Sequence, residues 1–260
     1  MSSIRRTCRA RRARVQQPVA GARGVKPLLA GGVVAAFVAA AAAPAVAAPV
    51  RVAPADEPGP AAAYSTRVDV DGDGRADHTQ LKKVGVRGSD YIFRLTTRTA
   101  TKRTFSTDIR VPRERDDLTA SDVWVGAAGV DGVRGGEVIV DRGGGVGDFP
   151  YSFVYTVRKG KWQLLLAPGA KSTKTNWSIG YHPAMVSGYE FTMNRGIRRV
   201  TATQLQWSSG DWDEPLYSGK RVTYRWVSGQ WKHSGTLDVK DVPDKQAREW
   251  SGWNGLIWRR

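Results

Sequence analysis

The sequence has very little cysteine and histidine: one cysteine, Cys8, and three histidines in 260 residues. His78, His182 and His233 form neither an H-E-x-x-H motif nor another spacing typical of a zinc site. A Gly-x-Ser-x-Gly motif, which carries the nucleophile of many serine hydrolases, is also missing. A single cysteine cannot form an intramolecular disulfide. These absences exclude a disulfide framework and the commonest hydrolase signatures. The stability of the fold must therefore come from a hydrophobic core or from a bound metal ion.

The N-terminal 47 residues have the composition of an export signal. Residues 1–26 hold eight basic residues and no acidic one, and residues 28–48 are apolar and rich in alanine. Ala45-Val46-Ala47 then supplies the small residues that precede a cleavage point. This order predicts a secretory signal peptide at 1–47. The alternative is a single membrane anchor, because the apolar stretch approaches spanning length.

Cleavage of this signal would remove Cys8 and leave a Pro/Ala-rich linker at 48–63 before the folded region. We then expect a secreted, extracellular protein, of bacterial type, with no stable membrane span. The whole chain has 40 basic and 24 acidic residues, a net charge of +16, and loss of eight basic residues leaves +8. Because the remaining basic residues are scattered, we expect no nucleic-acid partner. A weak attraction to anionic wall polymers or to phospholipid headgroups stays open.

The strongest chemical signal is the run Asp69-Val70-Asp71-Gly72-Asp73-Gly74-Arg75-Ala76-Asp77. It places four carboxylates within nine residues, with glycine where the backbone must turn. A hard divalent cation takes six to eight oxygen ligands. The run therefore predicts a Ca²⁺ site with side-chain ligands from Asp69, Asp71, Asp73 and Asp77 and a carbonyl ligand from Arg75. The alternative is a solvated turn without an ion, in which four like charges repel each other.

The residues that follow this run separate it from an EF-hand. Position 12 counted from Asp69 is Gln80 rather than the required glutamate, and the next residues are β-branched and aromatic without a helical period. A calcium loop that leads into a β-strand is the better interpretation. The run resembles the FG-GAP/VCBS-type repeat, which forms blades of integrin-like β-propellers. The resemblance implies that calcium is structural and that Asp69, Asp71, Asp73 and Asp77 are its ligands.

Two sequence motifs recur along the chain. Asp131 lies 60 residues after Asp71, and Glu137 lies 60 residues after Asp77, within a similar but less acidic motif. The segment 155–162 aligns without gaps to 224–231, and each has glycine between two aromatic arms, as in a β-hairpin. We therefore predict an all-β fold of antiparallel meander repeats at 64–260, forming a partial or small β-propeller-like domain. The expected units lie near 66–118, 119–170 and 183–240.

Tryptophan is the second functional signal, with nine of ten tryptophans after residue 160. A flat indole can pack in a core or stack on a ligand such as a sugar ring. Trp212 lies in an acidic turn, and three more lie near the C-terminus; these four are the candidate ligand-binding residues: Trp212, Trp250, Trp253 and Trp258.

The sequence favours a secreted, non-catalytic, calcium-binding module that contacts a glycan, a wall polymer or a protein outside the cell. One alternative is a secreted carbohydrate- or wall-binding lectin that uses the C-terminal tryptophans. Another is an extracellular hydrolase that uses the acids of Asp211-Trp212-Asp213-Glu214. We expect no catalytic residues, because adjacent acids in one short stretch are more often a polar turn.

Overall fold

The structure is a computed structural model that describes residues 63–113, 117–143, 150–170 and 177–259. The expected signal peptide and all but the last residue of the expected linker lie outside these residues. The described chain consists mainly of antiparallel β-strands, which confirms the prediction of an all-β fold built from meanders.

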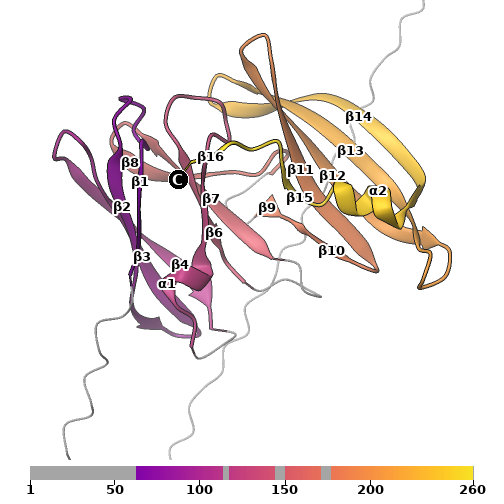
Figure 1. The fold of residues 1–260 in the computed structure, drawn as a ribbon, viewed down its shortest axis with the longest axis horizontal. Coiled ribbons are helices and arrows are strands. Elements are labelled where there is room, and N and C mark those ends of the chain that lie inside the picture. Colours follow the sequence, from indigo (N-terminus) through magenta and orange to yellow (C-terminus); the bar gives the residue numbers. More distant parts are fainter. Residues whose placement is uncertain (1–62, 114–116, 144–149, 171–176, 260) are drawn as a thin grey trace, which may run out of the picture. The chain divides into compact units, whose positions relative to one another are not determined.

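The strands form three sheets (Figure 1). The first sheet follows chain order: β1 (Tyr64–Val68), β2 (Asp77–Arg87), β3 (Asp90–Arg98) and β4 (Thr104–Pro112). The second sheet contains β5 (Trp124–Ala128), β6 (Glu137–Asp141), β7 (Tyr151–Arg158), β8 (Lys161–Leu165), β9 (Trp177–Ser178) and β16 (Trp258–Arg259). The third contains β10 (Gly180–His182), β11 (Met185–Asn194), β12 (Ile197–Ser209), β13 (Leu216–Val227), β14 (Gln230–Pro243) and β15 (Gly252–Asn254).

The described residues form two short helices, α1 (Ala120–Val123) and α2 (Asp244–Glu249). Neither has the length or the apolar character needed to cross a membrane.

The aligned segments 155–162 and 224–231 form equivalent hairpins, as the sequence predicts. Lys159 and Gly160 join β7 to β8 with φ values of 53° and 70°, and Ser228 and Gly229 join β13 to β14 with φ values of 51° and 79°. Two consecutive residues with positive φ are the mark of a type I′ turn, whose twist matches that of the flanking strands. In the first sheet, the corresponding turn between β3 and β4 is longer and spans residues 99–103.

The central strand of the second sheet, β6, is buried on both faces. On β6, Val138 and Val140 join the core cluster shared with the first sheet, whereas Ile139 joins the cluster shared with the third sheet. Strand side chains alternate between faces, so a strand packed on both sides reads as a continuous apolar run. This explains why 137–141 shows no polar alternation. A third cluster lies between the third sheet and α2.

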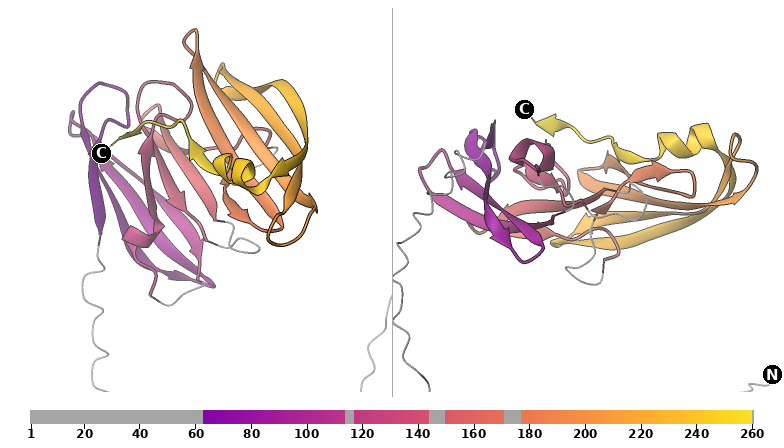
Figure 2. Two further views of the ribbon diagram at one scale, coloured as in Figure 1. Left: turned by 45° about the vertical axis from the view of Figure 1, so that its right-hand side comes forward. Right: turned by 90° about the horizontal axis from the view of Figure 1, so that it is seen from below.

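The C-terminal segment adds strands to existing sheets (Figure 2). β15 pairs in parallel with β11, and β16 then pairs with β5 at the edge of the second sheet. The close approach requires glycine at Gly188, since a Cβ there would lie 2.2 Å from the carbonyl oxygen of Trp250. The last residues therefore pair with both the second and the third sheet.

Candidate metal site

The acidic run forms the loop between β1 and β2. The carboxylate of Asp69 accepts hydrogen bonds from the backbone N–H groups of Gly72, at 2.7 Å, and Gly74, at 3.0 Å. Both glycines have positive φ, which a residue with a side chain adopts only with strain. Gly72 also has no room for a Cβ, which would lie 2.8 Å from the carbonyl oxygen of Arg134. The sequence D-x-D-G-D-G thus folds around the first aspartate.

Three of the predicted ligands converge in this loop. One carboxylate oxygen from each of Asp69, Asp71 and Asp77 lies within 4.8 Å of the others. The pKa of Asp71 is raised, first by partial burial and then by the negative charges of Asp77, Asp73 and Asp69. Carboxylates gathered in this way offer the hard oxygen donors that Ca²⁺ prefers, and a cation would remove their mutual repulsion.

Asp73 lies outside this cluster. Its carboxylate accepts hydrogen bonds from Nε of Arg75 at 3.3 Å and from Nη2 of Arg75 at 3.0 Å. The backbone N–H of Arg75 and this guanidinium together lower the pKa of Asp73. Of the five ligand positions predicted from the sequence, the structure therefore brings three side chains together and pairs the fourth with Arg75.

Asp77 fixes the loop to the rest of the first sheet. It is fully buried, and its Oδ2 accepts hydrogen bonds from the backbone N–H groups of Val70 at 3.0 Å and Asp71 at 3.4 Å. Its Oδ1 accepts a hydrogen bond of 2.9 Å from the N–H of Ala100 in the β3–β4 turn. Asp77 therefore links both loops at this end of the sheet.

The second unit contains a similar loop between β5 and β6, and there an arginine contacts the acids. The backbone N–H of Val130 donates to Oε2 of Glu137 at 2.6 Å, as that of Val70 donates to Asp77. Here Nη2 of Arg158 donates to the carboxylate of Asp131 and lies 3.7 Å from Oε1 of Glu137. A guanidinium is thus bound by the two acids that stand 60 residues after Asp71 and Asp77.

Burial of Glu137 and the negative charge of Asp131 raise the pKa of Glu137 to about 8. The hydrogen bonds from Val130 and Thr156 and the charge of Arg158 act in the opposite direction but are the smaller effects. Sequence comparison between the units identifies Asp131 and Glu137 but not Arg158, which lies in the β7–β8 hairpin. No local pattern indicates that the hairpin supplies a cation to the loop.

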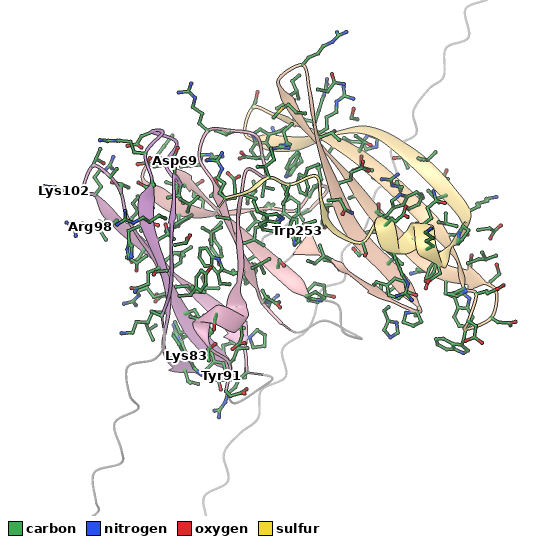
Figure 3. All side chains as sticks on the ribbon, viewed as in Figure 1. Asp69, Lys83, Tyr91, Arg98, Lys102 and Trp253 are labelled. Atoms are coloured by element: carbon green, nitrogen blue, oxygen red, sulfur yellow. The ribbon has the colours of Figure 1, made fainter. Side chains whose placement is uncertain are left out.

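The two loops and the third sheet are joined directly. The N–H of Gly136 in the second loop donates to the carbonyl oxygen of Asp69 at 2.7 Å. Nη2 of Arg198, at the start of β12, donates to the carbonyl oxygen of Gly129 at 2.6 Å. Figure 3 labels Asp69 near the end of the first sheet. The conformation of the acidic loop therefore affects the packing of the second loop.

The third unit has no comparable loop. The connection between β11 and β12 is a two-residue turn at Arg195 and Gly196 with φ values of 49° and 76°. It presents no carboxylate, and the acidic run of this unit, Asp211 to Glu214, lies instead on the turn between β12 and β13.

The four candidate tryptophans differ in their packing. Trp212 is 66% exposed, and its ring centroid lies 4.9 Å from that of Trp207. Trp253 stacks on Tyr189 at 5.6 Å and on Phe191 at 6.0 Å within the second core cluster (Figure 3). The Arg221 guanidinium lies 4.2 Å from the ring centroid of the half-buried Trp250.

Trp258, on the edge strand β16, is 40% exposed. It packs over Gly126, where a Cβ would lie 2.7 Å from the indole ring. Trp212 is therefore the candidate with the largest free surface. The acids beside it, Asp211, Asp213 and Glu214, lie on an exposed turn between β12 and β13.

Comparison of the chain with protein-family models, with curated proteins and with solved structures finds no match.

Proposed function

We propose that this is a secreted, non-catalytic β-repeat protein whose first loop binds one Ca²⁺ and which acts as a binding or surface-interaction module outside the cell. The observation that carries the calcium site is the convergence of oxygens from Asp69, Asp71 and Asp77. The signal-like residues 1–47 support export, and the β-repeat resemblance supports a structural role for the ion.

Calcium in this loop would act on stability. The three carboxylates would supply oxygen ligands, and the backbone hydrogen bonds of Asp69 and Asp77 already hold the loop in a tight turn. Because Gly136 donates to the carbonyl of Asp69, an ion that fixes this loop would also strengthen its contact with the second loop. An ion that binds the folded state alone stabilises it by mass action.

Thermal and denaturant unfolding with calcium and with chelator test this proposal. At a calcium concentration about 100 times Kd, we expect the free energy of unfolding to rise by about 2.7 kcal/mol. Asp71→Ala should abolish this rise, whereas Asp213→Ala, a matched exposed aspartate from another acidic turn, should retain it. Unfolding that is the same in calcium and in chelator would overturn the proposal.

A further inference from the structure

A cleft of about 550 Å³ lies between the second and third sheets, away from the acidic loop of the first unit. One wall comes from β7 and β8, and the other comes from the turn between β13 and β14. The residues that line it and bear on its chemistry are Asp131, Arg158, Gln163, Trp226, Gln230 and Trp231. Its volume falls within the range of about 300–1,000 Å³ typical of small-molecule sites.

The charged groups of the cleft neutralise each other. Arg158 is paired with the buried carboxylate of Asp131 and lies 3.7 Å from Oε1 of the buried Glu137. A cationic ligand would compete with Arg158 for these acids, and an anionic ligand would have to draw Arg158 from its partners. The electrostatics therefore favour a neutral ligand.

The remaining polar groups are suited to hydroxyls. Gln163 and Gln230 are both exposed, and a carboxamide offers two donors and an acceptor on one planar group. They enter the cleft from opposite sheets, Gln163 from β8 and Gln230 from the first position of β14. A ligand with hydroxyl groups at both ends could bond to both sheets at once.

The apolar part of the cleft combines the aliphatic residues 164–167 and Ala170 with two tryptophans. Trp226 and Trp231 face each other across the β13–β14 hairpin, with ring centroids 4.9 Å apart and planes at 66°. Both are half-buried, so each presents only part of its indole to the cleft. A partly exposed indole offers a flat apolar surface beside polar groups.

From this combination we infer that the cleft binds a neutral saccharide of one or two rings, with its apolar ring face against Trp226 or Trp231 and its hydroxyls on Gln163 and Gln230. A pyranose ring is neutral, carries hydroxyls around its rim and has an apolar C–H face. The inference extends the proposed binding role and names its ligand class, but it does not depend on calcium in the first loop.

The test adds cellobiose, lactose or N,N′-diacetylchitobiose to the purified protein. Binding is measured by tryptophan fluorescence and by ligand-observed NMR. We expect at least one sugar to bind with a Kd of about 1 mM or tighter, which is a binding free energy of a size that a few hydrogen bonds and one stacking contact can supply. The double variant Gln163→Ala/Gln230→Ala should weaken binding about tenfold, because it removes the hydrogen bonds to ligand hydroxyls. Its melting temperature should be unchanged, since both side chains are exposed.

Two controls locate the site. Gln206→Ala, at an exposed position of β12 outside the cleft, should leave sugar affinity unchanged. If Trp212→Ala abolishes sugar binding and the double variant retains it, the sugar binds at the exposed Trp212 and not in the cleft. Absence of binding by all three sugars would overturn the inference as well. Calcium titration of the double variant should match wild type, so failure of the cleft is distinguishable from failure of the calcium site.

Discussion

Two buried acids, Asp77 and Glu137, hold equivalent places in the first two units, and each accepts a hydrogen bond from the backbone N–H seven residues before it. They differ in the positive charge available to them. Asp77 lies with the carboxylates of Asp69 and Asp71, whereas Glu137 and Asp131 share the guanidinium of Arg158. The second loop thus has a cation built into the chain, whereas we propose that the first takes its cation from solution.

Replacement of Arg158 tests this difference at the residue scale. Arg158→Ala leaves the buried carboxylate of Asp131 without its cation, and removal of one partner from a buried pair costs about 3 kcal/mol or more. We expect a loss of that size in urea unfolding. Arg225→Ala, an exposed arginine on β13, is the matched control and should change stability by less than about 0.5 kcal/mol. Equal effects of the two variants would contradict the role given to Arg158.

The raised pKa of Glu137 has a defined pH signature. Between its usual value of 4.5 and about 8, the folded protein holds a proton on Glu137 that the unfolded chain releases. This contribution to stability is fully present below pH 4.5 and is lost as the pH rises through about 8. Relative to Glu137→Gln, the wild type should therefore lose stability across this window. Urea unfolding at several pH values measures the difference, and Glu214→Gln, at an exposed acid, should follow the wild type.

At the scale of single elements, the hairpins depend on glycine at the second turn position. Gly229 has a φ of 79° and open space around it, so Gly229→Ala tests backbone strain without a steric clash. We expect a loss of about 1 kcal/mol, the cost of a left-handed conformation for a residue with a Cβ. Gly235, on β14 of the same hairpin, also has open space but no positive φ, and Gly235→Ala should not destabilise. Equal losses at both positions would rule out the turn strain.

The C-terminal segment offers a second test of an element. Trp253 on β15 stacks on Tyr189 and Phe191, so Trp253→Ala should cost about 3 kcal/mol or more in unfolding free energy, as for other core aromatic truncations. Trp212→Ala removes an exposed indole and should cost less than about 0.5 kcal/mol. If Trp253→Ala left the unfolding free energy unchanged, the C-terminal segment would not contribute to the core.

At the scale of the whole molecule, the antiparallel meanders could be predicted because their signals are local. Glycine at short turns, aromatic residues on both arms and the 60-residue offset between Asp77 and Glu137 are all visible in the sequence. The units expected from the sequence lie near 66–118, 119–170 and 183–240. In the structure, β1–β4 span 64–112, β5–β8 span 124–165 and β10–β14 span 180–243.

The rest depends on contacts between residues far apart in the chain. Arg158 reaches Asp131 across 27 residues, and the pairing of β16 with β5 brings Trp258 beside Ala128. No periodicity or turn residue encodes such pairings. The pairing of Asp73 with Arg75 was not expected either, because the aspartate pattern alone treats all four carboxylates as equivalent.

The most direct test of the account is the number of calcium ions that the purified protein binds, measured by calorimetric titration on wild type and on Asp71→Ala. We expect one site per chain in the wild type, because the first loop gathers three carboxylates and the second already holds Arg158. We expect none in Asp71→Ala. Two sites would contradict the role of Arg158 as the built-in cation of the second loop, and no binding to the wild type would contradict the calcium site itself.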